Sequence, residues 1–287
     1  MQQSNEVSIH KDYKYIIQST VYESAENKTA FYKACEVGTG RVVGIKVIDA
    51  ANQTALRAYM NEVNVLAKLE SHDAHIPVIY YSYYRGTRLY IVMQYIEGDT
   101  LAKKIDADSQ YVLERETTFK NLRRLASIAG VLRSIHRKIP GMGDYTQHKD
   151  LKPQNIIIKG TYPHERIYLV DFGISASRTM RGTGTLGYQS PEQSALFSGS
   201  ADSSRVDVFS FGLIMYELLC GKRLVLGEDL VLDKQTGEWK NIPLITKVNP
   251  NVPRQIDDIL RQCLAYNPKK RLRDGGAIEC LLKKTIR

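Results

Sequence analysis

The first third of the chain is dominated by alternating apolar and polar positions. From residue 13 to residue 47 three β-rich runs follow one another, YIIQSTVYE, TAFYKACE and RVVGIKVID, separated by a polar turn and a glycine-bearing turn. A period of two is typical of half-buried strands, and short turns join antiparallel neighbours. The pattern therefore predicts a three-stranded antiparallel meander, and two more strands are expected at residues 78–84 and 88–94.

A helical period interrupts these strands at residues 54–69, where apolar residues recur three or four positions apart. Glu62 lies in the middle of this predicted helix, beside its apolar face, and Lys46 lies inside the third strand. A charge next to a buried seam is costly unless it is paired. We therefore expect Lys46 and Glu62 to form an ion pair. The alternatives are a lysine whose head reaches solvent and an exposed glutamate at the edge of the apolar face.

The remaining two thirds of the chain is mainly helical in its periodicity. Helices are predicted at residues 119–138, 206–219, 256–264 and 277–284, and short strands at residues 155–159 and 166–170. The helix at 206–219 is nearly all apolar and should be the buried axis of this part. Residues 95–99 break the pattern and are expected to link two lobes. The fold class is therefore α+β, with a small, mainly antiparallel β lobe that carries one helix and a larger, mainly helical lobe.

The densest group of polar residues is the sequence HKDLKPQN at residues 148–155. Asp150 could accept a hydroxyl proton, and the amide oxygen of Asn155 suits a hard cation such as Mg²⁺. Lys152, between them, could neutralise charge on a transferring phosphoryl group. A polar surface loop stiffened by Pro153 would explain any two of these residues, but all of them in this order favour a catalytic loop.

Two further carboxylates belong with this loop. Asp171, in the triplet DFG, directly follows the strand at residues 166–170. A carboxylate at a strand end, followed by a flexible glycine, is a natural metal ligand on a movable segment. Asp207 begins the nearly all-apolar helix and needs a buried partner, so we expect it to accept backbone N–H groups of residues 148–155.

Composition narrows the classes of function. The net charge is +9, but no nucleic-acid-binding motif accompanies it, so we expect a solvated basic helix face and no nucleic-acid partner. The four cysteines form no CxxC pair, which argues against a disulfide framework or a zinc site. The N-terminus lacks the apolar stretch of a signal peptide, and the longest apolar run is about half a membrane span. We therefore expect a cytoplasmic protein without a membrane span.

In their order and spacing these features resemble a eukaryotic-type serine/threonine protein kinase catalytic domain. The resemblance rests on Lys46, Glu62, HKDLKPQN, DFG, the SPE at residues 190–192, Asp207 and Arg271. It implies a single kinase domain over residues 1–287, with an N-lobe at about 12–94, a hinge at 95–99 and a C-lobe at 100–287. It further implies phosphoryl transfer from ATP, with Mg²⁺ or alternatively Mn²⁺, to hydroxyl groups of protein substrates. Nothing in the sequence indicates an oligomeric state.

The resemblance also assigns roles to the polar residues. Lys46 would hold the α and β phosphates of ATP while paired with Glu62. Asp150 would orient the substrate hydroxyl and accept its proton, with Lys152 stabilising the transferring group. Asn155 and Asp171 would ligate two Mg²⁺ ions. Lys152, together with Thr185, resembles the serine/threonine subfamily, and the sequence ending at Gln193 resembles bacterial members.

The remaining assignments concern adenine and the framework. Met93 resembles the gatekeeper, Gln94 to Ile96 resemble the hinge that bonds adenine, and Ile157 is placed in the nucleotide site. Glu192 and Arg271 match a buried ion pair with a structural role.

The chain departs from the family pattern at several positions. No glycine is present at residues 24–29, where the family has its glycine-rich phosphate loop. Lys149 replaces the arginine that usually binds an activation-loop phosphate, and Gly44 replaces an alanine that usually touches adenine. The missing glycines motivate one alternative, a pseudokinase that binds without catalysis. A small-molecule phosphotransferase of similar fold is a second alternative, against which Lys152 and Thr185 count.

Overall fold

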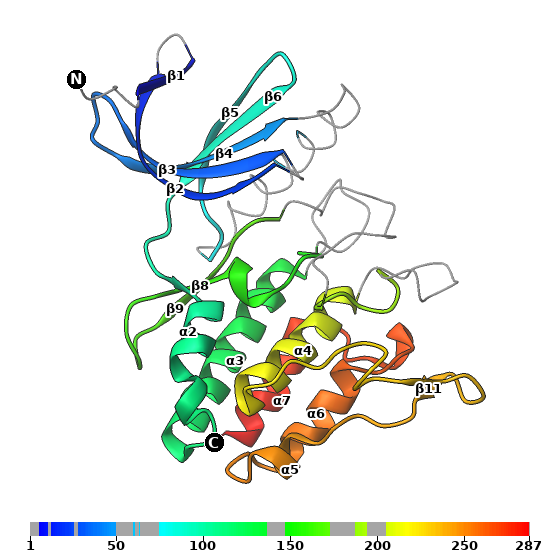
Figure 1. The fold of residues 1–287 in the computed structure, drawn as a ribbon. Coiled ribbons are helices and arrows are strands. Elements are labelled where there is room, and N and C mark those ends of the chain that lie inside the picture. The colour runs from blue at the N-terminus through cyan, green and yellow to red at the C-terminus, as the bar shows by residue number, and fades with distance from the viewer. Residues whose placement is uncertain are drawn as a thin grey trace. The chain divides into compact units, whose positions relative to one another are not determined.

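The computed structural model describes residues 6–10, 13–25, 28–49, 60, 63, 75–136, 147–172, 187–193 and 205–286. The chain forms two compact units, an N-terminal unit at Met1–Glu97 and a C-terminal unit at Gly98–Arg287. The first unit is mainly a β-sheet and the second is mainly helical (Figure 1). The secondary structure of the two units confirms the predicted α+β class, with a small β part and a larger helical part.

The N-terminal unit is built on one antiparallel sheet in the order β1-β2-β3-β4-β6-β5. Its strands are β1 (Glu6–His10), β2 (Tyr13–Ser24), β3 (Thr29–Glu36), β4 (Val42–Asp49), β5 (Ile79–Arg85) and β6 (Arg88–Gln94). The predicted meander and the two later strands are confirmed. Strand β1 was not predicted, because an edge strand in a polar segment carries little alternation; its pairing with β2 defines it.

Alternating side chains give this sheet two different faces. One apolar cluster contains Tyr15, Ala34, Val43, Ile45 and Val92, and the other contains Ile48, Val63, Leu89 and Ile91. Because successive residues of a strand point to opposite faces, Gly44 and Lys46 share the face of Ile48. We call this the Lys46 face.

The predicted helix at residues 54–69 is described only at Met60 and Val63, which are both helical. Val63 packs into the cluster on the Lys46 face. Glu62 and the rest of that helix lie outside the described residues, so its predicted ion pair with Lys46 stays a prediction.

The C-terminal unit combines helices with short strands. The helices are α2 (Leu101–Asp108), α3 (Arg115–Ile135), α4 (Val206–Cys220), α5 (Ile245–Val248), α6 (Gln255–Cys263) and α7 (Gly275–Thr285). The strands β7 (Asp99–Thr100), β8 (Ile156–Lys159) and β9 (Arg166–Leu169) form one sheet, and β10 (Leu232–Asp233) pairs with β11 (Glu238–Trp239). Short 3₁₀ turns occur at Ser109–Tyr111, Pro153–Asn155 and Pro268–Lys270.

Helix α4 is the buried axis of this unit, as its apolar sequence predicts. Nearly every one of its residues is buried, and the helix ends at Gly221, whose φ of 68° is the left-handed conformation that glycine favours. A Cβ at Gly212 would lie 2.7 Å from Leu264 Cδ2, so α4 and the end of α6 pack closely there. Helix α3 starts at Arg115, four residues before the predicted start, and the short helix α2 was not predicted.

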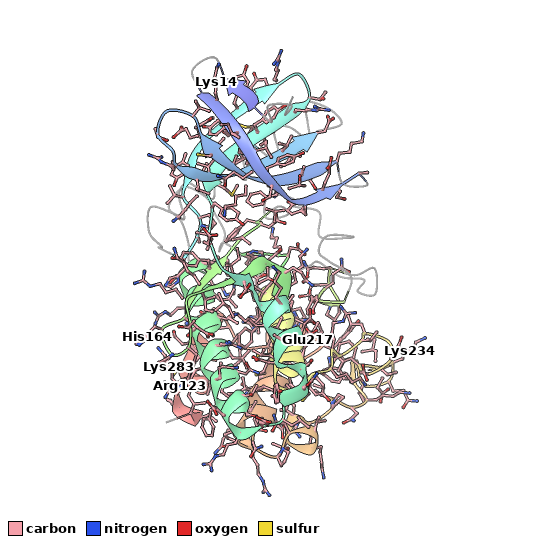
Figure 2. All side chains as sticks on the ribbon, turned by 60° about the vertical axis from the view of Figure 1, so that its left-hand side comes forward. Lys14, Arg123, His164, Glu217, Lys234 and Lys283 are labelled. Atoms are coloured by element: carbon pink, nitrogen blue, oxygen red, sulfur yellow. The ribbon has the colours of Figure 1, made fainter. Side chains whose placement is uncertain are left out.

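The segment between α4 and α6 contains a small hairpin. Trp239, on β11, donates a hydrogen bond from Nε1 to the carbonyl oxygen of Leu264 at 2.5 Å, and its ring meets Tyr266 edge-on. Lys234, in the turn of the hairpin, points away from the body of the C-terminal unit (Figure 2). In the described part of the chain, no helix has both the length and the apolar character needed to cross a bilayer.

Candidate active site

The loop at residues 148–155 ends in a 3₁₀ turn, Pro153–Asn155, that leads directly into β8. Pro153 occupies the first position of the turn, where its fixed φ is favourable and its missing N–H costs nothing. The backbone N–H of Asn155 donates to the carbonyl oxygen of Lys152 at 3.0 Å. This turn fixes the direction of the polar side chains on both sides of it.

Asp207 holds the start of this loop through backbone hydrogen bonds. Its buried carboxylate accepts the backbone N–H of His148 at 2.7 Å and that of Lys149 at 2.8 Å. Burial alone would raise the pKa of Asp207, but the hydrogen bond from His136, the nearby histidines and the backbone bond from His148 outweigh it, and the pKa lies below its ordinary value. The prediction that Asp207 caps backbone N–H groups of the loop is confirmed.

His136, at the end of α3, completes this arrangement. Its Nδ1 accepts the backbone N–H of Gly275 at 3.1 Å, so its Nε2 carries the proton that is donated to Asp207 at 2.9 Å. One side chain thereby joins the end of α3, the start of α4 and the start of α7. Sequence reasoning assigned no role to His136; its only signal is a polar residue directly after an apolar helix.

Asp150, Lys152 and Asn155 form one polar constellation. The Nδ2 atom of Asn155 donates to the Asp150 carbonyl oxygen at 2.9 Å and to Asp150 Oδ2 at 3.1 Å. Lys152 Nζ lies 2.9 Å from the same Oδ2. Asp150 is only 9% exposed, so its carboxylate is held in a partly desolvated position by a cation and an amide.

Asp171 is joined to this constellation through the β8–β9 pair. The N–H of Val170 donates to the carbonyl oxygen of Asn155 at 3.0 Å, which continues the register of the two strands. The Nδ1 atom of His148 accepts the Asp150 N–H at 3.3 Å, and its Nε2 donates to the Val170 carbonyl oxygen at 3.0 Å. The His148 ring lies 4.4 Å from the buried ring of Phe172. The backbone around Asp171 is thus tied to the loop from both sides.

The donor set fits a hard divalent cation. Asn155 uses Nδ2 for both hydrogen bonds of its side chain to described residues, which leaves the amide oxygen Oδ1 to face a cation. Asp171 offers a carboxylate one residue beyond the strand segment that Asn155 contacts. No group of three or more His, Cys, Asp or Glu side chains gathers as a metal site among the described residues. A cation such as Mg²⁺ is usually held by one or two carboxylates together with substrate phosphates, so two protein oxygens suffice.

The backbone of Asp171 has a φ of 63°, and Lys149 has a φ of 64°. Both values are left-handed, where residues with a Cβ are uncommon and are held by their surroundings. The bonds at Asp207 and at Val170 supply that restraint on either side of the catalytic loop. The sequence could not reveal these two conformations.

In the N-terminal unit, Lys46 is 8% exposed and lies in the centre of β4. Met93 pairs with Gly44 across the β4–β6 ladder, and the Gln94 N–H donates to the Val78 carbonyl oxygen at 2.7 Å. Ile96, beyond the end of β6, is buried. The predicted gatekeeper and hinge residues therefore follow one another at the end of one strand.

Ile157 belongs to the C-terminal unit, on the face of β8 opposite to the buried Ile156 and Ile158. Its contact with a nucleotide stays a prediction.

The relationship of this chain to other proteins follows from its match to a known family. The protein kinase domain family matches residues 27–284. The chain belongs to this family. The resemblance to a protein kinase catalytic domain that was found in the sequence is confirmed.

Two of the relatives are bacterial proteins that are named serine/threonine kinases. The chain is 29% identical over 279 residues to the serine/threonine-protein kinase PknL of Mycobacterium tuberculosis, covering 93% of this chain and 64% of the relative. It is 28% identical over 262 residues to the serine/threonine-protein kinase PrkC of Bacillus subtilis, covering 88% of this chain and 38% of the relative. The chain therefore spans less than two thirds of the length of these relatives.

The fold of the kinase domain is confirmed by a solved structure. The Mycobacterium tuberculosis PknI kinase domain, in a form that carries a point mutation, matches with a TM-score of 0.70 at 20% identity. The match covers 99% of each chain.

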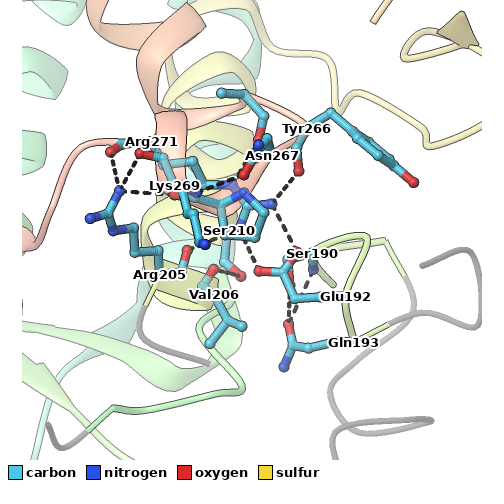
Figure 3. Close-up of polar contacts among 12 residues, drawn as sticks. Ser190, Glu192, Gln193, Arg205, Val206, Ser210, Tyr266, Asn267, Lys269 and Arg271 are labelled. Carbon is cyan, nitrogen blue, oxygen red and sulfur yellow. Dashed lines mark hydrogen bonds and ion pairs between the residues drawn. The ribbon is translucent and has the colours of Figure 1, made fainter. Parts of the chain in front are cut away.

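The buried ion pair expected in this kinase domain is present. Arg271 Nη1 lies 2.5 Å from Glu192 Oε1 and Nη2 lies 2.8 Å from Oε2, with both side chains fully buried (Figure 3). Arg271 also donates from Nε to the carbonyl oxygen of Ala265 and from Nη2 to that of Tyr266. This bidentate contact anchors the SPE segment to the loop that precedes α7.

The residue after SPE has a role that the sequence did not indicate. Gln193 donates from Nε2 to the carbonyl oxygen of Lys149 at 2.7 Å. Its Oε1 accepts the N–H and the hydroxyl of Ser190 (Figure 3). It therefore couples the SPE segment to the backbone of the catalytic loop. Residues 173–186 of the activation segment, including Thr185, lie outside the described residues.

The glycine-free turn between β2 and β3 is partly described. Lys28, directly before β3, has a φ of 50°, a left-handed conformation that glycine adopts without steric cost. A lysine thus takes a conformation that glycine would adopt more easily. Residues 26 and 27 lie outside the described residues.

Proposed function

We propose that this chain is an active serine/threonine protein kinase that transfers the γ-phosphoryl group of ATP to Ser or Thr hydroxyls of protein substrates, itself included. One observation carries the proposal. Asp150, Lys152 and Asn155 form a single hydrogen-bonded constellation that is tied through Val170 to the segment of Asp171. A proton acceptor, a cation and two metal-ligand candidates are the groups that phosphoryl transfer requires.

Each group has a role that its contacts support. Asp150, oriented by Asn155 and Lys152, accepts the proton of the substrate hydroxyl. Lys152 offsets the charge that builds on the transferring group. Asn155 Oδ1 and the Asp171 carboxylate would hold Mg²⁺, with Mn²⁺ as the alternative ion, which would supply positive charge beside the phosphates.

The nucleotide-binding residues are assigned from the resemblance to the family. Lys46, buried on its face of the sheet, binds the α and β phosphates with Glu62 as its partner. Met93, Gln94 and Ile96 supply the gatekeeper and the hinge for adenine, and Ile157 supplies an apolar contact. In this assignment the two compact units are the lobes of one kinase domain, with an N-lobe at about 12–94, a hinge at 95–99 and a C-lobe at 100–287.

Autophosphorylation with labelled ATP tests this function directly. The full chain with Mg²⁺ should incorporate phosphate on Ser or Thr, and Asp150→Asn should lower the rate by about 10²- to 10⁴-fold, the usual cost of losing a general base. Asp258→Asn, on the exposed surface of α6, is the matched control and should leave the rate unchanged.

Three outcomes contradict parts of the proposal. Equal labelling of wild type and Asp150→Asn would remove Asp150 as the base. Phosphotyrosine as the sole product would overturn the substrate class. Nucleotide binding without any labelling of the chain or of added protein substrates would show a pseudokinase.

A further inference from the structure

Arg223, three residues beyond the end of α4, covers the backbone just before Tyr188. A Cβ built on Gly187 would lie 2.9 Å from both Cζ and Nη1 of Arg223, so the guanidinium is in contact with the Gly187 backbone. The same guanidinium lies over the Tyr188 ring, with Cζ 5.3 Å from the ring centre, where the ring face attracts a cation. Arg223 is therefore held beside the activation segment, although its side chain is exposed.

The neighbouring carboxylate of Glu217, on α4, is already engaged by Tyr188. Tyr188 Oη donates to Glu217 Oε2 at 2.5 Å. Burial raises the pKa of Glu217; the hydrogen bond from Tyr188 and the charge of Arg223 offset part of this effect, while the charge of Asp106 adds to it. A partly buried, hydrogen-bonded carboxyl group with a raised pKa attracts cations from solvent weakly. The charge presented to solvent over Tyr188 is therefore the positive charge of Arg223.

Tyr188 also connects Arg223 with the proposed base. Tyr188 and Asp150 line the same small hollow of the C-terminal unit. The Tyr188 backbone is held there by Ser210, whose hydroxyl donates to the Tyr188 carbonyl oxygen at 2.7 Å. A protein segment whose hydroxyl reaches Asp150 has to pass beside Tyr188. Because an extended segment advances about 3.3 Å per residue, the residues next to the acceptor hydroxyl come within reach of the long Arg223 side chain.

We propose that Arg223 selects protein substrates that carry an acidic side chain within about three residues of the phosphorylated Ser or Thr. This inference rests on the proposed kinase function and names the class of substrate. A planar guanidinium binds a carboxylate through two parallel hydrogen bonds, and it repels Lys or Arg at the same substrate position. An exposed charge pair contributes up to about fivefold in affinity, so attraction and repulsion together should give about 10-fold.

Phosphorylation of a peptide set by the full chain tests this selection. Each peptide has a single Ser or Thr among alanines, with Asp, Ala or Arg placed at one position at a time, from three residues before the hydroxyl to three residues after it. We expect the wild type to have a kcat/KM about 10-fold higher for Asp than for Arg at one or more positions. The difference should lie mainly in KM, because the charge contact is already made in the ground state. High salt should reduce it by screening the exposed charges.

Arg223→Glu reverses the charge and should reverse the preference, so that Arg peptides become better substrates than Asp peptides, while the all-alanine peptide keeps its kcat. Lys222→Glu is the matched control. It makes the same change of charge one residue earlier, at an exposed side chain that pairs with Asp229 at 3.1 Å. This control should keep the preference for Asp peptides.

Several results would overturn the selection by Arg223. The first is a wild type with equal kcat/KM for Asp, Ala and Arg peptides at every position, or one that labels itself but no peptide. The second is an Asp preference that Arg223→Glu leaves unchanged, or that Lys222→Glu reverses equally. The third is an equal loss for all three kinds of peptide in Arg223→Glu, which would show that Arg223 merely supports Tyr188.

The kinase function itself has a separate readout. In each of the results above, labelling of Ser or Thr by the wild type would leave that function standing. A wild type that labels neither itself nor any peptide would instead refute the proposed function and this inference with it.

Discussion

Asn155 donates a hydrogen bond from Nδ2 to the Asp150 carboxylate at 3.1 Å, so one amide both orients the proposed base and leaves its own oxygen for the proposed metal. Removing this side chain should therefore affect both the orientation of the proposed base and the binding of the proposed metal ion. We expect Asn155→Ala to lower phosphoryl transfer by at least about 10- to 100-fold, the usual cost of losing a group that supports a metal site. The Mg²⁺ concentration for half-maximal rate should rise, as measured by titrating Mg²⁺ at saturating ATP.

Asn251→Ala is a suitable control for Asn155→Ala. Asn251 donates to the Leu113 carbonyl oxygen at an exposed place in the C-terminal unit. A normal Mg²⁺ dependence in Asn155→Ala would contradict the assignment of Asn155 as a metal ligand.

Lys46 should discriminate between ligands with and without phosphate. We expect Lys46→Met to weaken ADP binding while adenosine binding stays within about twofold, because the lysine is assigned to the phosphates and methionine conserves much of its volume. Lys240→Met, at an exposed position, should change neither affinity. Calorimetric titration of both ligands measures the difference, and equal weakening of both would place Lys46 elsewhere.

Asp207 should make the stability of the domain depend on acid pH. Its pKa is lower in the folded chain than the unfolded value of about 3.9, so its stabilisation is fully present above that value and is lost as the pH falls through the lower folded pKa. At pH 7 we expect Asp207→Asn to lower the free energy of unfolding by about 1.5–3 kcal/mol, because the buried donors on His136, His148 and Lys149 lose an anionic acceptor. Urea unfolding measures this quantity.

The difference between wild type and Asp207→Asn should shrink when the same urea experiment is repeated between pH 4 and pH 3. A difference that stays constant over this range would contradict the lowered pKa of Asp207. Asp258→Asn, on the exposed surface of α6, serves as the control.

The Glu192–Arg271 pair should stabilise the domain far more than a surface pair does. Glu192→Gln leaves a buried guanidinium without its anion, which typically costs about 3–5 kcal/mol. Arg261→Ala breaks the exposed pair with Asp258, which should cost less than about 1 kcal/mol. Denaturant unfolding of both variants gives the comparison, and equal losses would contradict the structural role of the buried pair.

The strands and most helices follow from local sequence patterns. Alternation alone predicts β2 to β6, and the continuous apolar sequence of α4 predicts a buried helix. The misses have a common cause, since α2 and β1 have weak periodicity. The edge strand β1 is defined by its pairing with β2, which is a contact between segments and leaves little trace in a single one.

For the site, the sequence by itself determined the chemical groups and their order. An acid, a cation and an amide within eight residues are rarely found together in a loop without a catalytic role. It also led to the expectation that Asp207 caps the loop, since a carboxylate at the start of an apolar helix needs buried donors. It did not reveal His136 or Gln193 as connectors, because their partners are Asp207, Gly275 and Lys149, far away along the chain.

Only the tertiary structure decided how those groups are oriented. The left-handed backbone of Asp171 and Lys149 is set by bonds at Val170 and Asp207, which no local preference encodes. Likewise, the sequence shows Gly44 only as a departure from the family pattern. The fold shows that the ring of Phe31 occupies the space that a Cβ at Gly44 would need. Side-chain identity is local information, but which side chains share one volume depends on the register of neighbouring strands.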